Sequence, residues 1–121
     1  IVGWNDGHVL LGLNPIIGYD MSGSQAFRPH FEPAFKFAVN TQRGFSVGSE
    51  YYAGFGLLDR GFDPVRLQEH LLFFAFDLAE PASATETEDG EDWELNVAVG
   101  RGLTQATDQT WVAKMIVGKP F

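Results

Sequence analysis

The stretch that decides the fold class is Gly44-Phe45-Ser46-Val47-Gly48-Ser49-Glu50-Tyr51-Tyr52-Ala53-Gly54-Phe55-Gly56, because its side chains alternate in character. Phe45, Val47, Tyr51 and Phe55 fall in one set, and Ser46, Gly48, Glu50 and Gly54 fall in the other. Successive side chains of a β-strand point to opposite faces of the sheet. This period of two therefore predicts a strand with one bulky apolar face and one face that is small or polar.

The same alternation continues on both sides of this stretch. Phe35, Phe37 and Val39 alternate with Lys36 and Ala38, Phe74 and Phe76 with Phe73 and Ala75, and Met115 and Val117 with Lys114 and Ile116. Turn and loop residues separate the alternating segments, which predicts seven strands, at 1–4, 8–20, 27–40, 44–56, 69–79, 93–102 and 110–121. Asn14-Pro15 interrupts the second strand, and one helical turn is expected within 62–72. The predicted fold class is all-β: a single domain over 1–121, built as an antiparallel up-and-down meander.

Length and composition narrow the functional classes. A chain of 121 residues allows one domain, and its lack of cysteine excludes a disulfide scaffold and thiolate metal sites. The net charge of -8 argues against nucleic-acid binding, which needs a basic surface. Six of the acidic residues lie in the segment 80–92, which we interpret as a solvated, flexible loop. No apolar run reaches the length of a transmembrane helix, and no signal-peptide pattern is present.

The lengths of the strands and the composition of their faces favour a transmembrane β-barrel. Strands that cross a bilayer need about nine to eleven residues, whereas strands of globular proteins usually have about five or six. In such a barrel the bulky face meets lipid and the small face, with its isolated charges, meets the lumen. The candidate lumen-facing residues are Glu32, Lys36, Glu50, Asp77, Glu94 and Lys114. The alternative is a soluble sheet with the apolar face in a core, such as a lipocalin-like barrel that binds an apolar ligand.

Aromatic residues and loop lengths agree with the membrane interpretation. Trp4, Trp93 and Trp111 all fall at ends of predicted strands, as expected for aromatic residues at a membrane interface. If the C-terminus is periplasmic, the short turns at 5–7 and 40–43 are periplasmic, and the longer connections at 21–26, 57–68 and 103–109 are external. The acidic loop would then lie on the periplasmic side, an exception to this rule.

The end of the chain resembles the C-terminal strand of bacterial outer-membrane β-barrels, with Phe121 preceded by alternating apolar residues at Trp111, Ala113, Met115 and Val117. Two inner stretches, 48–52 and 95–104, resemble the last strands of a poorly characterised group of proteobacterial outer-membrane proteins often labelled as transporters. The resemblance implies residence in the outer membrane, contact with membrane lipid, and recognition of Phe121 by the barrel-assembly machinery. Lys119 and Pro120 depart from the usual terminal pattern. Seven strands are also too few for a bacterial barrel, which indicates that the chain is the C-terminal part of a longer barrel protein or that further strands come from elsewhere.

Residues for catalysis, cofactor binding or metal binding are not indicated. The sequence has no Gly-x-Gly-x-x-Gly loop, no Gly-x-Ser-x-Gly elbow and no His-Glu-x-x-His, and His8, His30 and His70 are far apart. We therefore expect a non-enzymatic protein without cofactor. The charges of the lumen face indicate a pore or transporter for small solutes, in which such groups tune selectivity. In a narrow barrel the same charges would instead form interior salt bridges that fill the lumen. A third hypothesis is an outer-membrane structural or assembly factor whose acidic loop binds a periplasmic partner.

Overall fold

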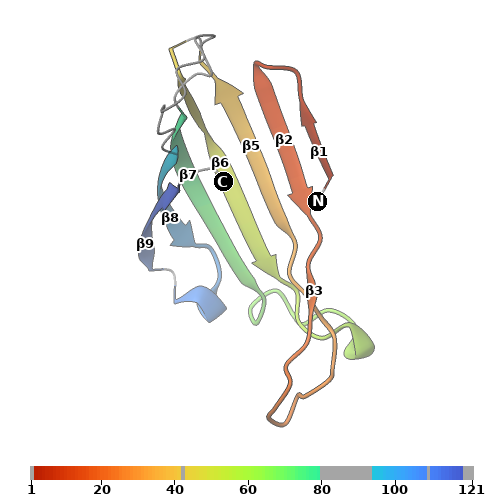
Figure 1. The fold of residues 1–121 in the computed structure, drawn as a ribbon. Coiled ribbons are helices and arrows are strands. Elements are labelled where there is room, and N and C mark those ends of the chain that lie inside the picture. Colours follow the sequence, from red (N-terminus) through yellow and green to blue (C-terminus); the bar gives the residue numbers. More distant parts are fainter. Residues whose placement is uncertain (1, 42, 80–93, 109, 119–121) are drawn as a thin grey trace.

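An antiparallel sheet of seven strands forms most of the described part of the molecule, and two short strands form a second sheet (Figure 1). The structure is a computed structural model that describes residues 2–41, 43–79, 94–108 and 110–118. The strands, in their order across the sheet, are β1 (Val2–Asn5), β2 (Val9–Asn14), β5 (Ala34–Asn40), β6 (Phe45–Gly54), β7 (Glu69–Ala79), β8 (Glu94–Gly102) and β9 (Trp111–Gly118). The all-β class and the up-and-down meander are thus confirmed. Within the described residues β1 and β9 do not pair with each other, so the sheet is open.

Two strands are shorter than predicted because proline interrupts them. A proline has no backbone N–H to donate to a neighbouring strand. β2 ends one residue before Pro15, and β5 starts one residue after Pro33. Four further residues form β3 (Ile17–Gly18) and β4 (His30–Phe31), which pair with each other as a separate two-stranded sheet. Phe31 also exchanges backbone hydrogen bonds with Phe55 and Gly56, directly beyond the end of β6. The continuous strands expected at 8–20 and 27–40 were therefore wrong.

Short turns connect neighbouring strands at one end of the sheet. Between β1 and β2, the Asn5 side chain accepts a hydrogen bond from the backbone N–H of Gly7 at 2.9 Å. The Asp6 carboxylate accepts from the backbone N–H groups of Val9 at 2.8 Å and His8 at 2.9 Å. These two N–H groups, first that of Val9, lower the pKa of the Asp6 carboxyl below its usual value. The hairpin turn predicted at 5–7 is confirmed.

Longer connections lie at the opposite end, where the β3–β4 hairpin projects beyond the sheet (Figure 1). Within 62–72, where one helical turn was expected, the chain makes a turn at 65–67, with hydrogen bonds from the Leu67 N–H to the Pro64 carbonyl and from the Gln68 N–H to the Val65 carbonyl, and does not continue into a helix. The 3-10 turns are η1 (Leu58–Arg60) and η2 (Gln105–Thr107), and Glu69 already begins β7. The Arg28 guanidinium binds both carboxylate oxygens of Asp59 at 2.7 Å and so attaches the projecting hairpin to η1. The rings of Phe31, Phe55 and Phe62 pack together at the same end of the sheet.

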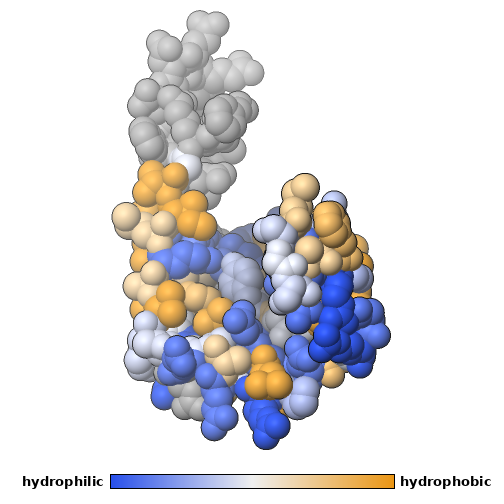
Figure 2. Space-filling view, turned by 90° about the horizontal axis from the view of Figure 1, so that it is seen from below, coloured by the Kyte–Doolittle hydropathy of each residue, from blue (hydrophilic) through white to orange (hydrophobic). Residues whose placement is uncertain are grey.

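The sheet is strongly curved, and most of its buried residues lie on the concave face. Ala38, Glu50, Phe73, Ala75 and Ala98 belong to the set that the alternation predicts to be small or polar, and Ala53 on β6 is the buried member of the other set. Their register places them in neighbouring positions, since Ala38 faces Gly48, Gly48 faces Ala75, and Ala75 faces Ala98. Figure 2, seen from the end with the long connections, shows a hollow between two walls of the molecule. The small side chains thus allow the sheet to curl around this hollow.

Candidate functional site

Charged side chains from four strands meet on the concave face. Lys36 on β5 faces Glu50 on β6 directly, and Glu50 faces Phe73 on β7. Glycine occupies the positions beside this row, since Gly12 faces Lys36 and Gly100 faces Phe73. A row with glycine at both ends leaves room for long side chains in its middle, which explains how a curved surface holds two charged residues and one aromatic ring.

The concave charge network, as we call it, consists of Lys36, Glu50, Asp77 and Lys114. The Lys36 ammonium lies 2.9 Å from Asp77 Oδ2 and 3.4 Å from Glu50 Oε1. The Lys114 ammonium contacts Glu50 Oε2. Glu50 is only 5% exposed, so its charge depends on these two lysines for compensation. The network holds two positive and two negative groups and is therefore electrically balanced.

Uncharged polar and aromatic groups complete the network. The Tyr52 hydroxyl donates to Glu50 Oε2 at 2.8 Å, and the Asn96 amide donates to Asp77 Oδ1. The Lys114 ammonium also lies 5.4 Å from the ring centroids of both Tyr52 and Phe73, within the range of a cation–π interaction. The side-chain carbonyl oxygen of Asn96 is buried and has no hydrogen-bond partner among the described residues.

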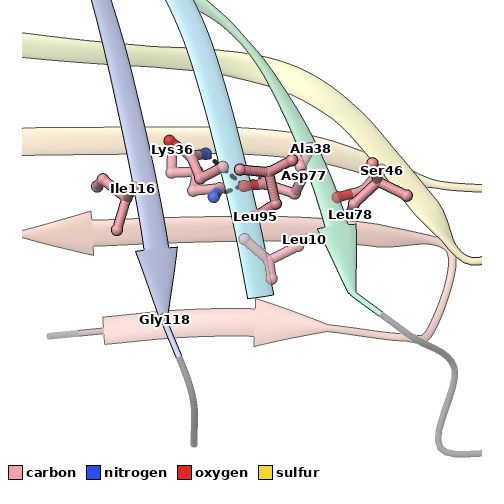
Figure 3. Close-up of a pocket in the computed structure, with 10 residues that line it drawn as sticks. Leu10, Lys36, Ala38, Ser46, Asp77, Leu78, Leu95, Ile116 and Gly118 are labelled. Atoms are coloured by element: carbon pink, nitrogen blue, oxygen red, sulfur yellow. Dashed lines mark hydrogen bonds and ion pairs between the residues drawn. The ribbon is translucent and has the colours of Figure 1, made fainter. Parts of the chain in front are cut away.

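Hollows surround the network on the concave face. One of about 260 Å³ lies towards the short turns. Its lining includes the polar residues Lys36, Asp77 and Asn96 and the apolar residues Leu10 and Ile116. Figure 3 shows Lys36, Asp77, Leu10 and Ile116 around it. A second, of about 210 Å³, lies towards the long connections and is lined by Glu32, Tyr52 and Glu69. A third, also of about 210 Å³, runs beside the network over Gly12 on β2. The network therefore separates the first two hollows, and the third lies between it and β2.

The opposite face carries bulky apolar side chains that are exposed. Phe74 is 67% exposed and Met115 is 70% exposed, and both belong to the apolar set of the alternation. Exposed members of the same set are Leu11, Leu13, Phe35, Phe37, Val39, Val47, Phe76, Leu78, Val97, Val99 and Val117. This distribution is the reverse of that in a water-soluble sheet, where bulky apolar residues are covered and charged ones are exposed.

Four of the six candidate lumen residues are brought together by the fold, namely the members of the concave charge network. Glu32 lies apart from them, between β4 and β5, where its carboxylate is 3.4 Å from His30 Nε2. Glu94 is the first residue of β8, and its side chain lies outside the described part of the structure.

The predicted interface aromatics Trp4 and Trp111 are both exposed, and each lies at or next to a strand end. The Arg101 guanidinium stacks on the Trp111 ring at 5.7 Å. Trp93, the acidic loop at 80–92 and the assembly signal Phe121 lie outside the described residues.

Sequence reasoning missed several residues of the site. Tyr52 and Asn96 were placed on the correct face but were not expected to bind the carboxylates. Both belong to the set of the alternation that is otherwise small, where a large polar side chain is unusual. This departure was the signal in the sequence that could have indicated a polar contact. The pairing of Arg28 with Asp59 joins two connections that are distant in sequence, and no pattern in the chain indicates it.

A metal centre is not formed by the described residues, which contain no group of three or more His, Asp or Glu side chains suited to hold an ion. His70 instead forms hydrogen bonds at both ring nitrogens: Nε2 donates to the side-chain carbonyl oxygen of Gln68 at 2.9 Å, and Nδ1 lies 2.5 Å from the Tyr51 hydroxyl. Among the described residues, no helix is long and apolar enough to cross a membrane. No protein-family model, curated protein or solved structure matches the chain.

Proposed function

We propose that this chain is an outer-membrane β-barrel, or the C-terminal part of one, and that the barrel is a pore or transporter for small solutes. In this arrangement the concave charge network faces the lumen and the exposed apolar face meets lipid. The observation that carries the proposal is the reversed distribution of side chains, with Phe74 exposed and Glu50 buried. Lipid solvates exposed phenylalanine favourably, and a polar interior is typical of outer-membrane barrels.

The lengths of three central strands support the proposal. β7 has 11 residues, β6 has 10 and β8 has 9, whereas β2 has 6 and β5 has 7 because prolines interrupt them. A strand of 10 or 11 residues extends about 33–36 Å, and a tilt of about 40° leaves about 25–28 Å along the barrel axis. This height matches the apolar band of outer-membrane barrels, which is about 25 Å.

The open edges of the sheet also bear on the proposal. Hydrocarbon offers no hydrogen bonds, so the backbone groups of β1 and β9 must be paired by further strands in a bilayer. The soluble alternative, a barrel that binds an apolar ligand, requires the phenylalanine-rich face inside. Phe35, Phe37 and Phe74 are instead exposed on the convex face of the curved sheet.

The membrane part of the proposal is tested with the full chain, purified with and without detergent. We expect aggregation in buffer alone, and in detergent a folded form whose gel mobility changes on heating. A monomer that stays in solution without detergent and shows no heat-dependent mobility would overturn the membrane assignment and favour the soluble alternative.

The transport part is tested by reconstitution of the folded protein into planar bilayers. We expect discrete conductance steps in potassium chloride. A protein that folds and inserts but shows no conductance would contradict the pore and leave the membrane assignment standing.

Deletion of residues 81–91 tests the assembly-factor hypothesis separately. If the acidic loop binds a periplasmic partner, the protein should lose that partner when the loop is deleted.

A further inference from the structure

We propose that the concave charge network is the constriction of this barrel and sets its selectivity between small cations and small anions. The inference rests on the proposed function, since it assigns a role to residues of the proposed lumen. Its basis is that the network reaches across the concave face. Lys36 lies on β5 and Lys114 on β9, and Glu50 connects the two.

The contact between Lys114 on β9 and Glu50 on β6 spans the concave face above β7 and β8. β7 and β8 lie between β6 and β9, and neighbouring strands are about 4.8 Å apart, so β6 and β9 are about 14 Å apart along the sheet. Two side chains on a flat sheet could not meet over that separation. They meet because the sheet curls and directs both inward, so the contact occupies the space through which a solute would pass.

The hollows on the concave face agree with a constriction at this level. The hollow of about 260 Å³ lies on the side of the short turns, and the hollow of about 210 Å³ lined by Glu32 and Tyr52 lies on the side of the long connections. Lys36 and Asp77 border the first, and Tyr52 borders the second. The remaining passage runs over Gly12, where the absence of a side chain leaves the third hollow beside Lys36 and Glu50.

The balance of charge within the network predicts how selectivity responds to substitution. With two ammonium groups and two carboxylates, the intact network favours neither sign strongly. Removal of one lysine leaves a carboxylate without its full compensation, and a fixed negative charge in a narrow passage attracts cations. Removal of Glu50 leaves excess positive charge and attracts anions. The two opposite substitutions should therefore shift selectivity in opposite directions.

The experiment measures conductance and reversal potential across planar bilayers in a potassium chloride gradient. Lys114→Gln should raise the ratio of potassium to chloride permeability about fivefold, and Glu50→Gln should lower it by a similar factor. The double variant Glu50→Gln/Lys114→Gln restores the charge balance, so its permeability ratio should return to that of the parent protein. Its conductance should stay above the parent value, because the contact that narrows the passage is gone.

Asp20→Asn is the matched control. Like Glu50→Gln it removes one carboxylate charge, but Asp20 is exposed in the connection between β3 and β4 and lines none of the three hollows, so we expect little change in either quantity. Each variant is first checked for the heat-dependent gel mobility of the folded form. If a single variant fails to fold, the double variant still tests the constriction, because it removes both charges of the contact and leaves no unpaired charge at either position.

Two results would overturn this inference and leave the proposed function standing. One is parent-like reversal potentials in both folded single variants. The other is parent-like conductance in the double variant. A parent protein that folds in the membrane without conducting would overturn the proposed pore and the constriction together.

Discussion

Lys114 on β9 contacts Glu50 on β6, although β7 and β8 lie between their strands. This one contact identifies the inner face of the sheet, because only a curled sheet directs side chains from strands so far apart toward each other. All the small-face residues found buried lie on the same side as this contact. The face that the alternation marks as bulky is consequently the outer one.

Stability should depend on the pairing of Lys114 and Glu50 more than on either residue alone. Lys114→Met leaves a buried carboxylate with only Lys36 as compensation, and we expect it to destabilise the folded protein by about 2 kcal/mol. The double variant Lys114→Met/Glu50→Gln should lose less than the sum of the single losses, with a coupling energy of about 1–2 kcal/mol. Urea unfolding in detergent or lipid measures all three variants, and strictly additive losses would show that the contact contributes nothing.

The outer face offers a direct discrimination between lipid and water as its surroundings. Phe74 is 67% exposed in the middle of β7, and Phe74→Arg should destabilise a membrane-inserted barrel by about 2–4 kcal/mol. Val65→Arg is the control, because Val65 is 68% exposed in a connection outside the strands and should tolerate the charge. Unfolding in lipid vesicles measures both variants. Equal tolerance of arginine at the two positions would contradict a lipid-facing surface at Phe74.

Two glycines of the concave face should respond differently to a methyl group. A Cβ at Gly48 would overlap the carbonyl oxygen of Phe37 on the neighbouring strand, whereas a Cβ at Gly12 would lie in ordinary contact, 3.8 Å from the Lys36 Cβ. Gly48→Ala should therefore lower the free energy of unfolding by about 1–3 kcal/mol, and Gly12→Ala should leave it nearly unchanged. The yield of heat-modifiable folded protein gives a first measure, and unfolding in urea gives the magnitude. Similar stabilities for the two variants would show that Gly48 is not sterically required.

The projecting hairpin should loosen when its attachment is removed. Arg28→Ala eliminates the bidentate ion pair with Asp59. Partly exposed ion pairs of this kind contribute up to about 1 kcal/mol to the stability of the local structure. We expect chymotrypsin to cleave after Phe27 about two- to fivefold faster, with no change in the stability of the sheet. Arg60→Ala, at the residue next to Asp59, is the control and should cleave at the parent rate. Unchanged cleavage in Arg28→Ala would mean that the hairpin is held by its other contacts.

Much of the sheet could be predicted from the sequence because its signals are local. Alternation along 44–56 and its neighbours defined the strands and their faces, and Asn5, Asp6 and Gly7 defined the first turn. The register then followed the alternation without a shift, as in Lys36 opposite Glu50 and Ala75 opposite Ala98. Errors arose where prolines break strands, at Pro15 and Pro33, because a single proline does not reveal whether a strand bends or ends.

Contacts between distant strands could not be predicted in the same way. The alternation placed Lys114 and Glu50 on one face, but their contact depends on the curvature of the whole sheet. Curvature arises from the small residues acting together, such as Gly48, Ala75 and Ala98, and from the twist of every strand pair. The partners of Asp77 and Tyr52 likewise depend on which side chains the curl brings within reach.

The direction of the strands limits how the sheet can be completed. Seven strands that alternate in direction leave the two edge strands, β1 and β9, pointing the same way. A ring made from copies of this sheet, all facing the same side of a membrane, would join β9 of one copy to β1 of the next as parallel neighbours. An odd number of extra strands inserted between the edges instead makes every neighbouring pair run in opposite directions. The parity of the sheet thus favours completion by a segment of different sequence over completion by self-association.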